Sequence, residues 1–389
     1  MLDLIFAHGS DPAAEDDLLG RLREHQRAVA ASESQFDRQV VRLIEAAVER
    51  DPAGTISFDG RNRATLRAEG HTWDAGRFEV PMLWSLKRRA RECSPEVPGA
   101  GERYRLWVID GEGAATDIGA LQATAPPGTL FQAASQFNCL ESPGTRVTPI
   151  NRYFSDPTQG PRASISAFPG TFVRHYAAPA NDGRRFTQTT DGDQIDLLAD
   201  VCHESVARVD NGYLHTECIY DPEALLQALT DRFDAIRVGV HDDVQVALGY
   251  NWTGSVEGER RIAQVFTSTL AGGGYSDRSV KHEPYLSICR QLLRAAYLGT
   301  LLAARALGKR AVVLTLIGGG VFSNPIRLIW ESILWALDAA WEVAPGALEV
   351  VVNGRAISQQ IARDELADEA RARGGVLLEM SRHGVSLRR

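Results

Sequence analysis

The 389-residue sequence has no surplus of positive charge, no long apolar run and few cysteines. Its 42 lysines and arginines face 50 aspartates and glutamates, and no basic block of useful length breaks this acidic average. We therefore expect no nucleic-acid partner. No apolar run approaches the roughly 18 residues of a membrane-spanning helix, so we expect no membrane partner either.

The first residues and the cysteines indicate where the protein acts. The opening segment, MLDLIFAHGSDP, carries an acid where a secretory signal peptide needs positive charge, and its apolar run is short. The five cysteines are odd in number and scattered, which suits a reducing compartment better than a disulfide framework. The sequence therefore predicts a cytoplasmic protein.

Signatures of nucleophilic catalysis and of zinc binding are also missing. The chain has no G-x-S-x-G nucleophile turn. Cys202, His203, His215 and Cys218 are of zinc-ligand type, but they include no C-x-x-C pair, and adjacent side chains on a strand point apart. We therefore expect no metal site and no cofactor.

The most informative stretch runs from Arg310 to Trp341. Ala311–Ile317 is a continuous apolar run rich in β-branched residues, which predicts a strand buried on both faces. Three glycines follow, and then Asn324 and Pro325, which favour an N-cap and a first helical residue. Such a strand, loop and capped helix direct free N–H groups and a helix dipole at one anion. The stretch therefore predicts a phosphate site, with a tight turn lacking any ligand as the alternative.

The pattern of this loop narrows the choice of phosphate ligand. No GK[ST] follows the glycines, so the loop is not a Walker loop. Gly318 and Gly320 fit G-x-G, but Ser323 stands where a dinucleotide fingerprint has its third glycine, and the loop lies late in the chain. Another class of phosphate-binding fold is therefore expected.

Strands and helices alternate from residue 103 onward, which predicts an α/β layered fold. The loop Ser94–Glu102 separates this part from a mainly helical N-terminal extension. We therefore divide the chain into residues 1–102 and 103–389. Expected elements are a helix within 18–48, a hairpin over 55–77, helices over 82–93, 284–307 and 364–373, and strands over 104–110, 130–140, 236–240, 244–248, 261–270 and 348–352.

Several motifs between residues 130 and 353 resemble the macrodomain family. These motifs are ASQFNCLE, DPTQGP, QIDLLAD, QVFTSTL and LIGGGVFSNP. Their sequences resemble those of the MavL-type macrodomains, a subfamily of arginine-specific ADP-ribosylhydrolases. The resemblance implies a three-layer α/β/α mixed sheet and an enzyme that binds ADP-ribose and cleaves its N-glycosidic bond to arginine in ADP-ribosylated proteins. The sequence departs from common macrodomains because DPTQGP stands where their catalytic glycine loop follows the asparagine.

The resemblance also implies positions for the ADP-ribose-binding residues. Asn138 is placed at the distal ribose, whose vicinal hydroxyls suit a group that both donates and accepts, and Phe322 packs on the ribose. Without the resemblance, Asn138 is equally a turn-stabilising residue. Gln136, Thr158, Gln159 and Gly160 are expected to line the other side of the ribose, with capping of the following helix as the alternative. The expected contacts along the diphosphate are Gly318, Gly319, Gly320, Val321 and Asn324. The glycines of AGGGYSD are a further candidate contact.

Cleavage of an N-glycosidic bond passes through an oxocarbenium-like state that a carboxylate stabilises. A second carboxylate can accept a guanidinium in two-pronged fashion. Asp242 and Asp243, in a short turn between two apolar strands, are the first candidates, and Glu257 and Glu259 are the second. A third cluster is Asp191, Asp193 and Asp196. For each acid the alternative is a solvated loop charge.

Two other functions compete with the hydrolase. The first is a module that binds ADP-ribose or a related nucleotide without turning it over, which needs no carboxylate near the anomeric carbon. The second is an NAD-dependent oxidoreductase, which needs an acid about twenty residues beyond the glycines at the end of the next strand. Asp338 and Glu342 fall near that spacing but on the predicted helix, which counts against the second alternative.

Overall fold

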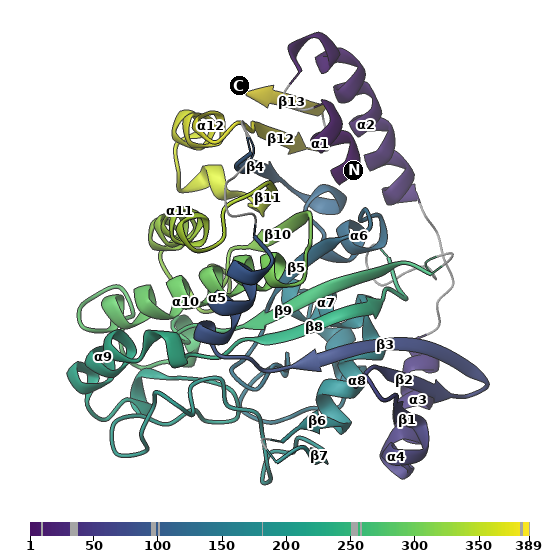
Figure 1. Ribbon diagram of the computed structural model, residues 1–389, viewed down its shortest axis with the longest axis vertical. Coiled ribbons are helices and arrows are strands. Elements are labelled where there is room, and N and C mark those ends of the chain that lie inside the picture. Colours follow the sequence, from purple (N-terminus) through teal and green to yellow (C-terminus); the bar gives the residue numbers. More distant parts are fainter. Residues whose placement is uncertain are drawn as a thin grey trace.

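The computed structural model describes residues 1–8, 11–31, 38–94, 99, 102–180, 182–249, 256, 259–381 and 384–388. An eleven-stranded sheet runs through the molecule in the order β1-β2-β3-β8-β9-β5-β10-β11-β4-β12-β13 (Figure 1). These strands are β1 (Ile56–Phe58), β2 (Ala64–Ala68), β3 (His71–Glu79), β4 (Tyr104–Gly111), β5 (Thr129–Ala134), β8 (Gly239–Gln245), β9 (Arg261–Thr267), β10 (Ala311–Thr315), β11 (Leu348–Asn353), β12 (Leu377–Ser381) and β13 (Gly384–Arg388). A separate small hairpin joins β6 (Ala178–Pro179) to β7 (Arg185–Phe186).

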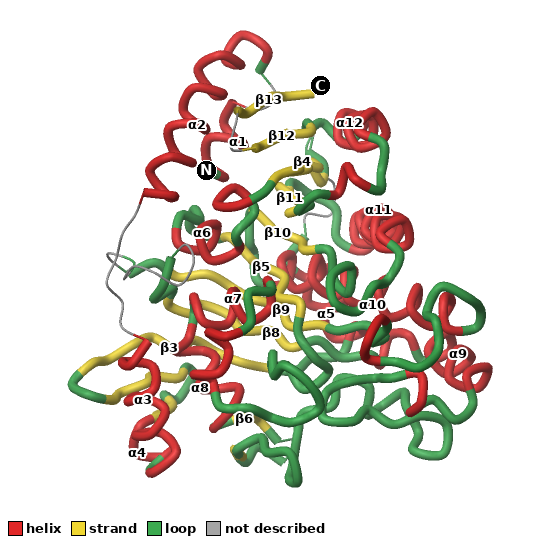
Figure 2. The backbone as a smooth tube through the Cα atoms, turned by 180° about the vertical axis from the view of Figure 1, so that it is seen from behind, coloured by secondary structure: helices red, strands yellow, loops and turns green. Residues whose placement is uncertain are grey.

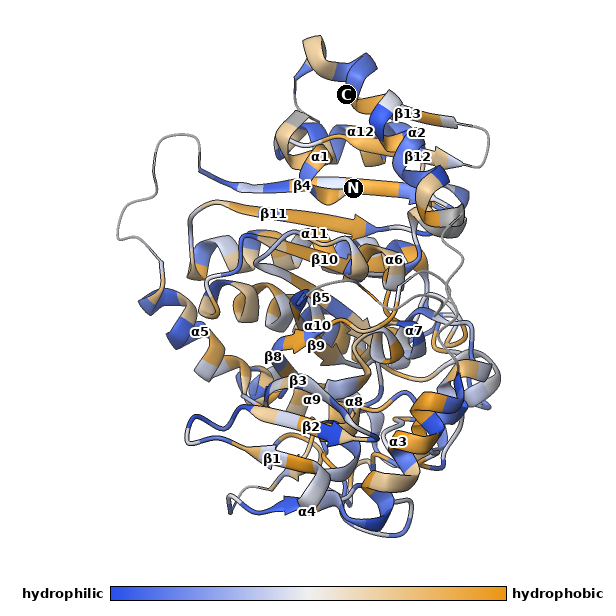
Figure 3. Ribbon diagram, turned by 90° about the vertical axis from the view of Figure 1, so that its right-hand side faces the viewer, coloured by the Kyte–Doolittle hydropathy of each residue, from blue (hydrophilic) through white to orange (hydrophobic). Residues whose placement is uncertain are grey.

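The centre of the sheet is parallel and its two flanks are antiparallel. Strands β9, β5, β10, β11, β4 and β12 all pair in parallel. Every residue of β10 is buried, as expected for an apolar strand covered on both faces, and Figure 3 shows the hydrophobic colouring of neighbouring β11. The carboxyl ends of the parallel strands therefore meet at one edge, where ligands of open α/β sheets bind.

Helices cover both faces of the sheet (Figures 1 and 2). Two buried glutamines link the sheet to the helices on its two faces. Gln132 of β5 donates to Thr300 Oγ1 in one helical layer, and Gln264 of β9 donates to the Ala163 carbonyl oxygen in the other layer. The first layer contains α5 (Leu83–Glu92), α9 (Pro222–Asp231), α10 (Tyr285–Ala306) and α11 (Ile326–Val343), and the second contains α6 (Ile118–Ala123), α7 (Gln159–Ser166) and α8 (Phe168–Tyr176). The predicted three-layer α/β class with a mixed sheet is confirmed.

The N-terminal region is built into both ends of the same sheet. Strands β1 to β3 extend it, because β3 pairs antiparallel with β8. Helix α2 packs on β13, where Arg23 donates to the Val385 carbonyl oxygen at 3.1 Å. The remaining helices are α1 (Leu2–His8), α2 (Glu15–Ala31), α3 (Arg38–Arg50), α4 (Pro52–Thr55) and α12 (Arg363–Ala372). Over the described ranges, none of the helices combines the length and the apolar character needed to cross a lipid bilayer.

The largest differences between predicted and observed elements lie in three regions of the chain. The helix expected within 18–48 is two helices, α2 and α3. The strand expected over 130–140 ends at Ala134, because the Gln136 N–H turns to the Leu140 carbonyl oxygen and Cys139 adopts a left-handed φ of +63°. The two strands expected around residues 241–243 are one strand, β8, with a bulge at which Asp243 has a φ of +61°.

Candidate functional site

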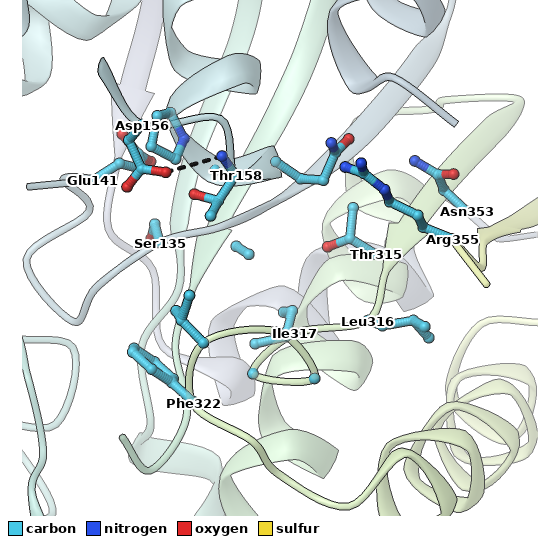
Figure 4. Close-up of a pocket in the computed structure, with 18 of the residues that line it drawn as sticks. Ser135, Glu141, Asp156, Thr158, Thr315, Leu316, Ile317, Phe322, Asn353 and Arg355 are labelled. Carbon is cyan, nitrogen blue, oxygen red and sulfur yellow. Dashed lines mark hydrogen bonds between the residues drawn. The ribbon is translucent and has the colours of Figure 1, made fainter. Parts of the chain in front are cut away.

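A pocket of about 470 Å³ opens at the carboxyl ends of β5, β10 and β11 (Figure 4). Its wall on one side is the start of α7, and on the other the glycine loop between β10 and α11. The residues that line it include Gln136, Glu141, Asp156, Gln159, Gly160, Tyr213, Tyr275, Thr315, Gly318, Gly319, Gly320, Val321, Phe322 and Asn353. The structure thus brings the predicted glycine loop together with Gln136, Gln159 and Gly160.

The glycine loop is shaped by its contacts with the segment that follows it. Gly318 has a φ of +73°, and a Cβ there would approach Thr269 Cγ2 to 2.6 Å, so only glycine fits without strain. Asn324 was expected to cap the helix, and this detail is wrong. Its buried side chain instead donates to the Leu270 carbonyl oxygen at 3.1 Å, and α11 begins at Ile326 after Pro325. Asn324 therefore fixes the loop from behind.

The second glycine cluster, in the motif AGGGYSD, packs closely against the loop that contains Gly318–Gly320. A Cβ on Gly272 would lie 2.5 Å from the Phe322 carbonyl oxygen, and one on Gly273 would lie 2.6 Å from that of Val321. This close approach carries Tyr275 into the pocket wall beside Phe322, with ring centroids 5.2 Å apart. Tyr213 stacks on Tyr275 at 5.4 Å. The three rings form an aromatic wall, while Val321 projects at the rim with 56% of its surface exposed.

Glu141 is the buried acid of the pocket. It lines the cavity with only 3% of its surface exposed. Its Oε2 accepts from the Ser164 hydroxyl at 2.6 Å and lies 3.9 Å from the Arg174 guanidinium, while its Oε1 has no hydrogen-bond partner. Burial raises the pKa of this carboxyl to about 7, against the opposing effects of Arg174 and Ser164. A carboxyl of this kind exchanges a proton near neutral pH.

Asp156 places a second carboxylate in the pocket. It follows the turn η3 (Ile150–Ser155), and its Oδ1 accepts from the Thr158 N–H at 2.9 Å. Its negative charge contributes to the raised pKa of Glu141, and Figure 4 shows the two side chains at the same end of the pocket. Both acids were missed in the sequence, although they belong to the quoted motifs ASQFNCLE and DPTQGP.

The other end of the pocket carries polar atoms without partners. Thr315 and Asn353 face each other in the register of β10 and β11. The Thr315 hydroxyl and the Asn353 Oδ1 are buried and have no hydrogen-bond partner, and the same holds for the Nε2 of Gln159. A buried polar atom without a partner is costly, so this end of the pocket suits a ligand with hydrogen-bonding groups.

Three of the acids proposed from the sequence do not reach this pocket. Strand β8 runs antiparallel to β9, so its second half lies at the amino end of β9, where Gln245 pairs with Arg261. There Asp243 forms an ion pair with Arg63, and Asp242 lies 2.6 Å from the Lys309 ammonium.

Glu259, with its side chain 81% exposed, pairs with Arg261 at the same edge, opposite the pocket. Glu257 lies outside the described residues. Of the third cluster, Asp193 and Asp196 line a separate hollow next to Arg237. Asp242, Asp243, Glu259, Asp193 and Asp196 therefore lie away from the glycine loop.

Asn138 is also absent from the pocket lining. It is fully buried, its Nδ2 donates to Gln194 Oε1 at 2.9 Å and its Oδ1 accepts from the Leu140 N–H at 3.0 Å. A Cβ on Gly212 would lie 2.6 Å from its amide. Asn138 thus stabilises the turn after β5, which is the alternative considered for it above.

No protein-family model matches the chain, and no curated protein matches it. Among solved structures, it is similar to the poly(ADP-ribose) glycohydrolase of Thermomonospora curvata, with 14% identity over 86% of this chain and 99% of that chain and a TM-score of 0.42. That enzyme was also solved bound to the inhibitor ADP-HPD. The Deinococcus radiodurans poly(ADP-ribose) glycohydrolase has 10% identity over 76% of this chain and 93% of that chain, with a TM-score of 0.41.

Proposed function

We propose that the protein is an ADP-ribosylhydrolase and that Glu141 is its catalytic acid. The observation that carries the proposal is the buried carboxyl of Glu141, whose Oε1 is left without a partner in a pocket that also contains the glycine loop. A module that only binds ADP-ribose needs no such acid. The motif resemblance described above points to the same ligand.

The pocket offers a contact for each part of ADP-ribose. The diphosphate lies against the N–H groups of Gly318 and Gly320 and the start of α11, where the helix dipole favours negative charge, while the Gly319 N–H donates to the Leu316 carbonyl oxygen at 3.0 Å. The distal ribose packs on Phe322 and Tyr275 and hydrogen-bonds Gln136. The adenosine then extends to the unpartnered polar atoms of Thr315 and Asn353.

Hydrolysis requires that the bond from the anomeric carbon to the leaving group breaks, that water adds to this carbon, and that a proton reaches the departing nitrogen or oxygen. Because the pKa of Glu141 is about 7, it supplies that proton as a general acid or takes one from the attacking water. Its charge, when ionised, stabilises the oxocarbenium-like state in a buried setting. No step needs a redox cofactor.

We further propose that the leaving group is an arginine side chain. A guanidinium is a planar donor that pairs with a carboxylate and stacks on aromatic rings. Asp156 and Tyr275 offer both partners in the same pocket. This preference, together with the resemblance to MavL-type enzymes, distinguishes arginine from serine or glutamate linkages and from the polymer.

The test is release of ADP-ribose from arginine-, serine- and glutamate-linked substrates and from poly(ADP-ribose), with ADP-ribose affinity measured by calorimetry. We expect release from arginine, and loss of at least a hundredfold in kcat in Glu141→Gln with affinity retained. Asp243→Asn is the matched comparison, because the sequence-based assignment predicts its inactivation and the present one does not. Binding without release from any substrate would leave a binding module, and absence of binding would refute the proposal.

A further inference from the structure

Arg174 lies beneath the proposed catalytic acid. This residue of α8 is fully buried. Its Nε donates to the Cys139 carbonyl oxygen at 3.0 Å, and its Nη2 donates to the hydroxyls of Ser164 at 2.7 Å and Thr171 at 3.1 Å. Its guanidinium also stacks over the ring of Phe266 at 3.6 Å. A guanidinium has five donors and no acceptor, so every one of these hydrogen bonds runs away from Arg174.

The tautomer of His241, the histidine beside Arg174, is consistent with Arg174 acting only as a donor. His241 Nε2 lies 2.6 Å from the Ala75 carbonyl oxygen, which can only accept, so this nitrogen carries the hydrogen. The other ring nitrogen, Nδ1, is then an acceptor, and it faces Arg174 Nη1 at 3.4 Å. Burial and the neighbouring Arg174 charge lower the pKa of His241 well below its usual value, so the ring is neutral.

Ser164 links Arg174 to the acid. Its oxygen lies 2.7 Å from Arg174 Nη2 and 2.6 Å from Glu141 Oε2. Because Arg174 can only donate, the serine oxygen accepts from it, and the single hydroxyl hydrogen of Ser164 is left for Glu141 Oε2. An oxygen that accepts this hydrogen cannot donate back along the same line. With the serine hydrogen directed at Oε2, the proton of Glu141 is favoured on Oε1, the oxygen without a partner.

We propose that Ser164 and Arg174 are positioning residues that hold the proton of Glu141 on Oε1, the carboxyl oxygen that no protein group engages. Neither residue is among those that line the pocket, so both act through Glu141. The arrangement of the three side chains stands by itself, whereas its catalytic consequence rests on the proposed function. A random orientation of the serine hydroxyl would leave the proton on either oxygen.

The charged and titratable groups around this acid are few. Arg174 of α8 and Asp156 after η3 act on Glu141 by their charges in opposite directions. Tyr153 of η3 and Cys139 on the preceding turn have raised pKa values through burial, and His175 and His241 have lowered ones. All four are neutral near pH 7. The Ser164 hydrogen bond favours the ionised form of Glu141, so its removal raises the pKa of this acid.

The direct test is infrared titration of Glu141 in the protein without ligand. The carbonyl band of the protonated acid is assigned by its loss in Glu141→Gln. We expect this band in the wild type to lie below the position of a carbonyl that accepts no hydrogen bond. In Ser164→Ala it moves to higher frequency and its midpoint rises by roughly one pH unit or more. Thr171→Val is the matched control, because Thr171 accepts from the same Arg174 nitrogen without contacting Glu141, and we expect an unchanged midpoint.

These results separate the inference from the proposed function, because no substrate is involved. A wild-type band at the position of a free carbonyl overturns the inference even if Ser164→Ala does not fold. An unchanged midpoint in folded Ser164→Ala overturns it as well. If hydrolysis is found, the limb of the kcat profile that depends on Glu141 should shift to higher pH in Ser164→Ala while ADP-ribose affinity is retained. A uniform fall in kcat without that shift would contradict the inference and indicate a purely structural role.

Discussion

Glu141 should make the stability of the folded protein depend on pH. Burial raises the pKa of its carboxyl from 4.5 to about 7, whereas in the unfolded chain the group keeps its ordinary value. Between these two pH values the folded state binds more protons than the unfolded state, so the free energy of unfolding falls as the pH rises. At 1.36 kcal/mol per pKa unit, the contribution of this nearly fully buried group amounts to about 3 kcal/mol, all of it present below pH 4.5 and lost above pH 7.

The assay is urea denaturation of the wild type and of Glu141→Gln at several pH values between 4.5 and 8. The wild type should lose about 3 kcal/mol relative to the variant across this range and then level off. Replacing the protonated acid by an amide adds an offset that does not depend on pH, the effect of the Arg174 charge is already part of the pKa of Glu141, and other titrating groups contribute equally to both proteins. Parallel curves would mean that folding does not raise the pKa of this carboxyl, and would refute its role as an acid poised near neutral pH.

Three further predictions concern the walls of the pocket. Gly318→Ala should lower the free energy of unfolding by more than about 1 kcal/mol, because the φ of this residue is +73°. In the same urea titration, Gly320→Ala should change the free energy of unfolding by no more than about 0.5 kcal/mol, because its Cβ would meet nothing within 4 Å. Tyr275→Ala should weaken ADP-ribose binding about tenfold by calorimetry, and Tyr275→Phe should retain most of the affinity if the ring is the contact. Asp156→Asn removes a like charge that raises the pKa of Glu141, so the Glu141 limb of the kcat profile should move to lower pH; an upward shift would contradict this.

Much of the fold could be predicted from the sequence because its signals are local. The continuous apolar run of β10 and the helical spacing of α11 depend on neighbours along the chain, and both elements occur where expected. The bulge in β8 and the early end of β5 could not be predicted in this way. They depend on pairing with β9 and on the turn around Cys139, which are contacts between segments distant in the sequence.

The candidate site also contains some features that could be predicted from the sequence and others that could not. The glycine loop could be predicted because a positive φ and a close approach demand glycine, and this requirement is visible in the residue type. Glu141 and Asp156 could not be predicted, because the residue type alone does not show whether an acidic side chain lies in a solvated loop or in a pocket. What distinguishes Glu141 from Asp243 is its burial over Arg174 and Ser164, whereas Asp243 pairs with Arg63 at the opposite edge of the sheet.

The N-terminal region contributes to this pocket although none of its residues lines it. Glu45 of α3 is buried, and its carboxylate accepts from the N–H groups of Ile150 and Asn151 at the start of η3. The same turn carries Tyr153, whose hydroxyl accepts from the Glu141 N–H at 3.0 Å, and it ends at Asp156. Burial raises the pKa of Glu45, against these hydrogen bonds, so the anchor is strongest when the acid is ionised. A helix from the first 50 residues thus holds the turn that positions both acids of the pocket, which makes the N-terminal region part of the framework of the site.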